Sequence, residues 1–448
     1  MSSLFGTSGV RGVLNESIDP EVALKIASSF GSEIGSSKTV MIGRDARTSG
    51  RMLENSIVSG LQSVGCNACT LGIVPTPVLG FSVGQSNVSG GIMITASHNP
   101  PEYNGLKLFD STGKAISPGE ERTVEKRYFK GRLSRCEWGE IGNIQRRDPI
   151  DGYLELVGKM VNLNDKFRVI VDCSNGPSSL TTPKLLRSLG CEVFTVNSQL
   201  DGYFPGRPPE PIEENLKHLE GLIRSMNADL ALAHDGDGDR IAALDDKGRF
   251  VPQDKLLALM AGYYADKEQT DVVTTVNASR VIEDMVTDVG RTVIRTKVGD
   301  VSVAEEMIGE NLYFGGEPSG TWILGDIHMC PDGTIAGIKI LEMLGYYSKK
   351  MSELVDTVRE YPIVREKVSC PGDEKKKKMR DVKSNVRNVF NNVRDLSETD
   401  GIRLELEDGS WVLVRPSGTE PYIRITAEAE TSQKAKDMVS KTRAIFGG

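Results

Sequence analysis

Residues 91–100 read Gly-Ile-Met-Ile-Thr-Ala-Ser-His-Asn-Pro. The apolar first half predicts a buried strand, and the hydroxyl of Ser97 follows where that strand ends. Pro100 and Pro101 donate no backbone hydrogen bond and disfavour a helix, so the chain is expected to leave the sheet as a stiff loop. Ser97 would then face solvent in a defined direction. On this stretch alone, a polar loop that only caps the strand is the more common arrangement.

Length and composition restrict the class of protein. With 448 residues the chain is too long for one ordinary core, and about three or four domains are expected. A hydrophobic fraction of 38% and a charged fraction of 26% are typical of a soluble globular protein. The net charge of −8 argues against a nucleic-acid surface, which needs a basic excess. The longest apolar stretch, 256–265, is half as long as a membrane-spanning helix of about 20 residues, so no membrane partner is expected.

The N-terminal residues and the cysteines indicate a cytoplasmic protein. The first residues have neither the basic nor the apolar segment of a secretion signal, and seven cysteines, an odd number, fit a reducing compartment. Cys66 and Cys69 form a Cys-x-x-Cys pair, but no second pair or histidine lies nearby to complete a zinc site. The lysine run at 375–378 is diluted by acidic residues and predicts a solvated helix face. No surface segment stands out as an interface, so the sequence leaves a homodimer open.

Strands and helices alternate in the same order three times along the chain. The expected elements are strand 38–43, helix 50–64, a strand from 65 and strand 91–95; then strand 167–172, helix 182–188, and strands 190–194 and 229–234; then strand 271–275, a helix to 289, and strands 290–294 and 311–314. Such alternation predicts sheets flanked by helices.

The C-terminal region has a different pattern. A lysine-rich helical stretch at 375–396 precedes strands at 402–407 and 410–414, which Asp408-Gly409 joins as a hairpin. A strand from Tyr422 and a helix from Ser432 follow. The predicted fold is therefore α/β: three related mixed, Rossmann-like three-layer domains and a smaller α+β domain around a central cleft. The expected domains are 1–150, 151–250, 251–365 and 366–448.

The loop after the third strand of each unit carries polar side chains. Ser97 follows in the first unit, Asp-Gly-Asp-Gly-Asp-Arg at 235–240 in the second, and Gly-Gly-Glu-Pro-Ser-Gly at 315–320 in the third. Open α/β sheets bind ligands at the carboxyl ends of their strands. Three equivalent loops would thus face one cleft.

The loop at 235–240 predicts a metal site. Glycines between Asp235, Asp237 and Asp239 remove side-chain obstruction, so the carboxylates can converge on one hard cation. A calcium EF-hand fits less well, because position 6 of the loop is Arg240 where glycine is required, and the flanks are strands. We expect Mg²⁺, with open positions for phosphate oxygens.

Three further segments offer groups for anions or sugars. Arg-Pro-Ser-Gly-Thr at 415–419 combines a guanidinium, two hydroxyls and backbone donors, which suits a phosphate, although an ordinary turn is equally compatible. The Gly-rich segment 6–12 is a second anion site without the ending of a P-loop, so nucleotide hydrolysis is not supported. The segment 43–49 brings two arginines to the first unit, either for function or as an Arg–Asp surface pair. Glu317 and Ser319 suit vicinal sugar hydroxyls.

The segments 94–100, 235–240, 316–320 and 415–419 occur in the order and spacing of the α-D-phosphohexomutase family, which the chain resembles over essentially its whole length. In that family three related α/β domains and a smaller C-terminal domain surround a deep cleft. The resemblance implies that Ser97 is a phosphoserine, and that one Mg²⁺ per chain is held by a phosphoserine oxygen with Asp235, Asp237 and Asp239. It implies that Glu317 and Ser319 recognise sugar hydroxyls. The phosphate that is not transferred would be held by Arg415, Ser417, Gly418 and Thr419. The residues that line the phosphoserine would be Arg11, His98, Lys107 and Arg240, with Lys107 as general acid/base.

The implied reaction interconverts a hexose 6-phosphate and a hexose 1-phosphate. Phosphoserine 97, primed by a hexose bisphosphate, donates to the free hydroxyl; the bisphosphorylated sugar turns end for end; and Ser97 recovers the other phosphoryl group. Mg²⁺ and the arginines would neutralise the charge of the transferring group. The expected partner is a small phosphosugar.

The identity of the sugar is less determined than the reaction. If Glu317 and Ser319 bind the hydroxyls on the ring side that gluco and manno sugars share, neither reads C2, where glucose, mannose and glucosamine differ, so phosphomannomutase/phosphoglucomutase activity remains an alternative. The Gly-rich N-terminal segment and the Thr-Glu-Pro ending at 419–421 favour glucosamine phosphates. Relatives often carry histidine after the sugar loop, where this chain has Thr321; His328 is either its substitute or a buried structural residue.

Two other classes of function compete with the mutase. A phosphatase could use Asp237 as nucleophile and Asp239 as acid/base, but it gives Ser97 no task. A non-catalytic sugar-phosphate sensor would keep the binding loops and tolerate Ser97→Ala.

Overall fold

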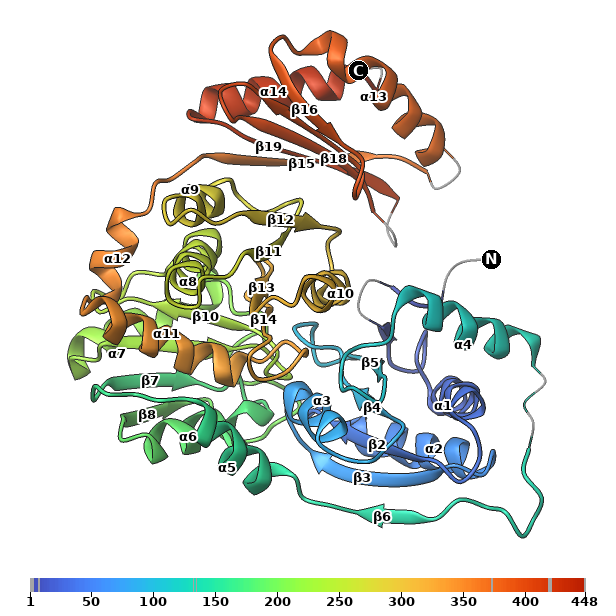
Figure 1. Ribbon diagram of the computed structural model, residues 1–448. Helices are drawn as coiled ribbons and strands as arrows, with labels where there is room; N and C mark the ends of the chain where they lie inside the picture. The colour runs from blue at the N-terminus through green and yellow to red at the C-terminus, as the bar shows by residue number, and fades with distance from the viewer. Residues whose placement is uncertain are drawn as a thin grey trace.

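A computed structural model describes residues 4–6, 9–131, 133, 135–371, 374–417 and 421–446. It contains four sheets, of six, four, four and five strands, that follow one another along the chain (Figure 1). Among the described residues no helix combines the length and apolar character needed to cross a bilayer.

The first unit is a six-stranded sheet with helices on both sides. Its strands, in spatial order, are β1 (Val10–Val13), β5 (Tyr103–Phe109), β4 (Gly90–Ile94), β2 (Thr39–Arg44), β3 (Asn67–Ile73) and β6 (Ile144–Arg146). Its helices are α1 (Pro20–Ile34), α2 (Gly50–Gln62), α3 (Thr76–Gly84) and α4 (Pro118–Lys130). All five residues of β4 are buried, as the apolar run predicts.

The second and third units each contain a four-stranded sheet. The second has strands β10 (Ile241–Leu244), β9 (Leu230–His234), β7 (Arg168–Asp172) and β8 (Glu192–Val196), with α5 (Ile150–Met160), the 3₁₀ helix η1 (Pro177–Leu180), α6 (Thr182–Ser188) and α7 (Glu213–Met226). The third has strands β12 (Val293–Thr296), β11 (Val272–Thr275), β13 (Phe314–Gly316) and β14 (Trp322–Leu324), with α8 (Gln253–Lys267), α9 (Val281–Thr287), α10 (Asp300–Glu310), α11 (Gly333–Tyr347) and α12 (Met351–Thr357).

The three units share one strand order. Each places its second, first and third strands side by side in parallel, and a fourth strand returns antiparallel to the third: β3-β2-β4-β5, β8-β7-β9-β10 and β12-β11-β13-β14. The predicted threefold α/β repeat is therefore confirmed. The loop between the third strand and its antiparallel return carries Ser97 in the first unit, the three aspartates in the second and Glu317 in the third.

The fourth unit is an antiparallel sheet covered by two helices. Its strands are β15 (Ile363–Ser369), β19 (Tyr422–Glu428), β18 (Trp411–Pro416), β17 (Ile402–Leu406) and β16 (Val393–Ser397), and its helices are α13 (Lys375–Val389) and α14 (Ser432–Ala444). The expected helix over 375–396 is wrong in its last part. The helix ends at Val389 because Phe390 is extended, with φ −120° and ψ 132°; Asn392 follows with a left-handed φ of 58°, and β16 then pairs with β17.

One apolar core joins the first three units. It runs from α3 and α5 to α8 and α11, and the apolar stretch at 256–265 lies buried along α8. A smaller cluster of Val276, Trp411 and Leu413 joins the fourth unit to the third. Figure 1 shows the four units following one another along the chain, with the fourth unit next to the third.

Candidate active site

Ser97 lies at the end of β4 in a strained backbone conformation. Its φ is +51°, a left-handed value that costs a residue other than glycine about 1–3 kcal/mol. Its N–H donates to Thr95 Oγ1 at 2.8 Å. The expectation that Ser97 faces solvent is wrong: only 1% of the residue is exposed, because the aspartate loop of the second unit covers it.

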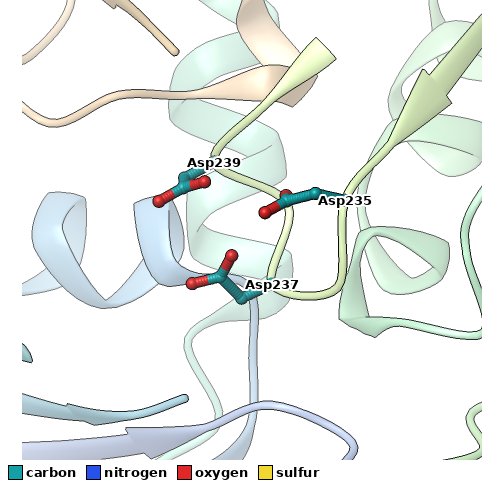
Figure 2. A group of neighbouring side chains, drawn as sticks. All are labelled: Asp235, Asp237 and Asp239. Atoms are coloured by element: carbon teal, nitrogen blue, oxygen red, sulfur yellow. The ribbon is translucent and has the colours of Figure 1, made fainter. Parts of the chain in front are cut away.

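The three aspartates of the second unit converge on one point (Figure 2). Asp235, Asp237 and Asp239, the aspartate triad, lie between β9 and β10, and each offers an oxygen within 4.8 Å of the others. Ser97 Oγ donates to Asp235 Oδ2 at 2.7 Å, although the two residues are 138 positions apart. The predicted nucleophile and the predicted metal ligands therefore meet.

The aspartate triad fits a divalent cation. All three carboxylates are buried, and Asp237 Oδ1 and Asp239 Oδ1 have no hydrogen-bond partner. Burial and the charges of the other two aspartates raise the pKa of Asp235 well above its usual range. Mg²⁺ prefers hard oxygen ligands such as carboxylates. Bound to the triad, it would use the free lone pairs and offset the repulsion among the three carboxylates. The two flanking elements are strands, unlike those of an EF-hand.

Lys107 and Thr76 hold the triad from the first unit. Lys107 Nζ lies 3.3 Å from Asp237 Oδ2 and 2.5 Å from Asp239 Oδ2. Burial lowers the pKa of Lys107, but the carboxylates of Asp237 and Asp239 outweigh it, so the pKa is raised and the side chain is a cation. Thr76 Oγ1 donates to Asp237 Oδ2 at 2.6 Å, and its backbone N–H donates to the Asp237 carbonyl at 2.9 Å.

Three other predicted residues surround Ser97. His98 Nδ1 lies 3.2 Å from Ser97 Oγ. Burial, together with the charges of Arg240 and Arg11, lowers the pKa of His98 to about 2, so its ring is neutral at pH 7. Burial lowers the pKa of Arg11 against the opposing effect of Asp237, whereas Asp235 and Asp239 raise the pKa of Arg240 despite its burial. A neutral imidazole thus lies beside Ser97 Oγ, and the charges of the two arginines act on that imidazole and on the aspartate triad.

The sugar loop of the third unit adjoins the aspartate loop. The N–H of Ile241 donates to the Gly320 carbonyl at 3.0 Å, and Arg240 forms a β-bridge with Thr321. Burial and the charge of Asp300 raise the pKa of Glu317 to about 7. Ser319 Oγ donates to Thr321 Oγ1 at 3.0 Å. The charges of Arg240 and Arg415 act in the opposite direction and lower the pKa of Glu317.

A cavity of about 470 Å³ lies between the first, third and fourth units. Its lining includes Arg415 and Ser417 from the fourth unit and Lys297 and Gly299 from the segment just before α10. Arg415 Nε pairs with Asp400 Oδ2 at 2.7 Å, and the Ser417 N–H donates to the Tyr422 carbonyl at 3.0 Å. Outside the described residues lie Gly418, Thr419 and Glu420 of the predicted phosphate loop and Thr7 and Ser8 of the N-terminal segment.

His328 lies in a separate cluster. Its Nε2 is 3.0 Å from Asp332 Oδ2, which also accepts from Tyr153 Oη at 2.7 Å, and its ring meets Phe81 edge-on. Asp332 Oδ1 caps α11 by accepting the Ile335 N–H at 3.0 Å. Through these contacts, His328 and Asp332 link α3 and α5 to α11.

Sequence reasoning missed several residues that support the site. Thr76 holds Asp237 from 161 positions away, and nothing near it in sequence indicates that role. Asp300 lies at the start of α10, beside Glu317 and Lys107. Of the two alternatives for segment 43–49, the surface Arg–Asp pair is wrong: Asp45 and Arg47 pair at 3.0 Å, fully buried, and Arg47 donates to carbonyls of the Ser97 loop.

Comparison with known proteins agrees with this arrangement. Four family sequence models match in order: phosphoglucomutase/phosphomannomutase α/β/α domain I over 2–135, domain II over 151–248, domain III over 252–361 and the C-terminal domain over 366–445. The chain belongs to the phosphoglucomutase/phosphomannomutase family. The resemblance to the α-D-phosphohexomutases is thereby confirmed, and the mutase class of enzyme with it.

Relatives of this phosphohexomutase match it from end to end. A phosphoglucosamine mutase of Methanocaldococcus jannaschii is 45% identical over 447 residues, which cover 98% of this chain and 97% of the relative. A probable phosphoglucosamine mutase of Methanothermobacter thermautotrophicus is 44% identical and covers 99% and 97%. The crystal structure of a phosphoglucomutase/phosphomannomutase family protein from Burkholderia thailandensis superimposes with a TM-score of 0.89 at 26% identity, covering 100% of this chain and 98% of that one.

Proposed function

We propose that this phosphohexomutase interconverts glucosamine 6-phosphate and glucosamine 1-phosphate through a phosphorylated Ser97 and a bisphosphorylated sugar. The observation that carries the proposal is the contact of 2.7 Å between Ser97 Oγ and Asp235 within the aspartate triad. A serine hydroxyl at a carboxylate cluster, bordered by Lys107, Arg11 and Arg240, is arranged for a phosphoryl group and its counter-charges.

Each half of the reaction exchanges one oxygen–phosphorus bond for another. A sugar hydroxyl oxygen forms a bond to phosphorus while the bond from phosphorus to Ser97 Oγ breaks, so the sugar loses a proton and Oγ gains one. The second half reverses these roles at the other end of the sugar. Lys107 is a cation, and we assign it the acid part of the proton transfer, next to the triad that Oγ contacts. The cationic side chains Arg11 and Arg240 offset the charge of the transferring group.

The aspartate triad and a phosphoserine oxygen are the groups that would hold Mg²⁺. When bound, the ion would act as a Lewis acid on the phosphoryl oxygens. The unpartnered oxygens of Asp237 and Asp239 support this assignment, and so do the burial and the repulsion by the other two carboxylates that raise the pKa of Asp235.

The remote phosphate would lie at the fourth unit. Arg415 and Ser417 line the cavity, and with Gly418 and Thr419 they would hold whichever phosphate is not reacting. Glu317 and Ser319, on the loop that adjoins the aspartate loop, would form hydrogen bonds with the sugar hydroxyls. A site that accepts either end of a bisphosphate also accepts a hexose bisphosphate, which would prime Ser97.

Glucosamine is the sugar that the relatives support. The two full-length relatives at 44–45% identity carry the phosphoglucosamine mutase name. The seven cysteines are all free thiols, which suits the reducing cytoplasm that we propose as its compartment.

A coupled assay with the 1-phosphates of glucosamine, mannose and glucose tests the proposal, with intact mass measured in parallel. We expect the highest kcat/KM for glucosamine 1-phosphate and one phosphoryl group on the protein. Ser97→Ala should abolish both turnover and phosphorylation. Ser59→Ala is the matched control, because Ser59 is exposed on α2 and bonds only the Asn55 carbonyl.

Each competing function predicts a different result. Net release of phosphate without isomer formation would indicate a phosphatase. An unchanged rate in Ser97→Ala would refute Ser97 as the nucleophile. Sugar-phosphate binding without any turnover in the parent would indicate a sensor.

A further inference from the structure

Arg47 uses every donor of its guanidinium beneath the Ser97 loop. The side chain is completely buried. Its Nε donates to Asp45 Oδ2 at 3.0 Å, its Nη2 donates to the carbonyls of Ser97 at 2.9 Å and Asn99 at 2.6 Å, and its Nη1 donates to those of Pro100 and Tyr103. A guanidinium has five N–H donors, so none is left over. One side chain therefore fixes the carbonyls of the loop that carries Ser97.

The other side of Ser97 is fixed by the same ion pair. Asp45 Oδ2 accepts from Thr95 Oγ1 at 2.7 Å, and Thr95 Oγ1 accepts the Ser97 N–H at 2.8 Å. The N–H and the carbonyl of Ser97 are thus both tied to Asp45 and Arg47. These hydrogen bonds hold Ser97 at its left-handed φ of 51°, a backbone conformation that is strained for any residue other than glycine.

A loop of the second unit, residues 201–207, lies directly on Arg47. The Phe204 ring centroid is 5.1 Å from Arg47 Cζ, a cation–π distance. A Cβ at Gly202 would come within 2.4 Å of the Ala46 carbonyl oxygen, so the two backbones are in contact. Phe204 is 5% exposed and itself has a left-handed φ of 50°.

The same loop holds the strand that leads into the aspartate triad. Arg207 Nε donates to Asp172 Oδ2 at 3.0 Å, and its Nη2 donates to the His234 carbonyl at 2.5 Å, one residue before Asp235. Phe204 Cε1 would be 3.5 Å from a Cβ at Gly236, inside the triad loop. Residues 201–207 therefore contact both the Ser97 loop and the aspartate loop.

We propose that Arg47 and Phe204 are positioning residues, which together fix Ser97 Oγ against the aspartate triad. Arg47 sets the conformation of the Ser97 loop, and Phe204 sets its place relative to the second unit. This assignment rests on the proposed role of Ser97 as the phosphoryl carrier. It predicts that losing either contact slows transfer while substrate binding, which lies mainly in the third and fourth units, is retained.

The test compares Arg47→Lys, Phe204→Leu and Thr95→Val with a control, Tyr203→Leu. Tyr203 is the adjacent aromatic residue of the same loop and is 71% exposed. For the three variants we expect kcat per mole of phosphoserine to fall by about 10- to 100-fold, because misplacing a reacting group by an ångström has an effect of that size. KM for the sugar phosphate should change by less than about twofold, the signature of a loss confined to the reacting state. Tyr203→Leu should keep the parental values.

Circular dichroism and thermal melting separate positioning from folding. If a variant loses activity only in proportion to its unfolded or unphosphorylated fraction, the residue is merely structural and the proposal is overturned. Parental kcat in folded Phe204→Leu and Thr95→Val would overturn it as well, even if Arg47→Lys does not fold. A parent protein without phosphoserine and without turnover would instead refute the proposed function on which the assignment rests.

Discussion

Gly236, between the first two aspartates of the triad, has no room for a side chain. A Cβ there would lie 2.5 Å from the Ser97 carbonyl oxygen, closer than the 3.0 Å below which real Cβ contacts essentially do not occur. The two loops would have to separate by at least the difference, 0.5 Å. The Ser97 carbonyl cannot yield easily, because Arg47 holds it at 2.9 Å and is itself completely buried.

Gly236→Ala should therefore damage both stability and catalysis. Inserting a methyl group into a packed contact destabilises by about 1–3 kcal/mol, which a lowered urea midpoint would show. Displacing Ser97 Oγ from Asp235 by half an ångström or more should lower kcat by about 10- to 100-fold. The assays are urea unfolding followed by fluorescence and mutase turnover in the coupled assay with glucosamine 1-phosphate.

Gly221→Ala is the matched control for this substitution. Gly221 is an exposed residue inside α7, and a Cβ there meets no atom within 4 Å. Alanine in a helix interior is favoured over glycine by about 0.5–1 kcal/mol, so the urea midpoint should rise and kcat should not change. A Gly236→Ala protein with parental kcat and parental midpoint would refute the close approach of the two loops.

Three further predictions concern the metal, the sugar carboxyl and the phosphate arginine. Mg²⁺ at a hundred times its Kd should stabilise the parent by about 2.7 kcal/mol in thermal melting, whereas Asp237→Asn should show little shift; equal shifts would exclude the triad as the metal site. The pKa of Glu317 is about 7 in the folded protein against an ordinary 4.5, so the native state binds the proton more tightly and its free energy of unfolding falls as pH rises from 4.5 to 7. Glu317→Gln should therefore lose turnover. It should be more stable than the parent at pH 8 but not at pH 5, which urea midpoints at the two pH values check. An equal difference in midpoint between variant and parent at both pH values would contradict this prediction. Arg415→Lys should raise KM for the sugar phosphate by about 10-fold with a smaller change in kcat, because an ammonium cannot reproduce a guanidinium fork on phosphate; an unchanged KM in steady-state kinetics would remove Arg415 from the phosphate site.

The parts of the fold that sequence alone predicts are those with strong local signals. The helix expected at 182–188 agrees with α6, and Asp408-Gly409 does join β17 to β18. The boundary at 389–393 was missed because Phe390 and the left-handed Asn392 interrupt a polar, amphipathic pattern that otherwise continues. β16 is a strand because β17 pairs with it, and such pairing has no local signature.

In the candidate site, too, only the residues with a strong local signal could be predicted from the sequence. The metal site can be predicted from Asp235, Asp237 and Asp239 because three carboxylates separated by glycines form a strong signal within five residues. The residues that support Ser97 cannot be predicted in this way, because Arg47 donates to carbonyls 50 to 56 positions away. A buried Arg–Asp pair and an exposed one have the same sequence, so the segment 43–49 alone could not distinguish them. The contacts with the Ser97 loop and with residues 201–207 show why the pair is buried.

The threefold repeat explains why the loops that carry Ser97, the aspartate triad and Glu317 meet, although each loop belongs to a different sheet. In every unit the informative loop joins the third parallel strand to its antiparallel return, so each leaves the carboxyl edge of its sheet. No sheet hydrogen bond links one unit's strands to another's among the described residues; the loops are joined by Ser97 to Asp235, by Thr76 to Asp237 and by Ile241 to Gly320. The candidate active site therefore lies at an interface between units. Its geometry depends on a few contacts between loops, and for that reason a single methyl group at Gly236 is expected to matter more than many changes within any one sheet.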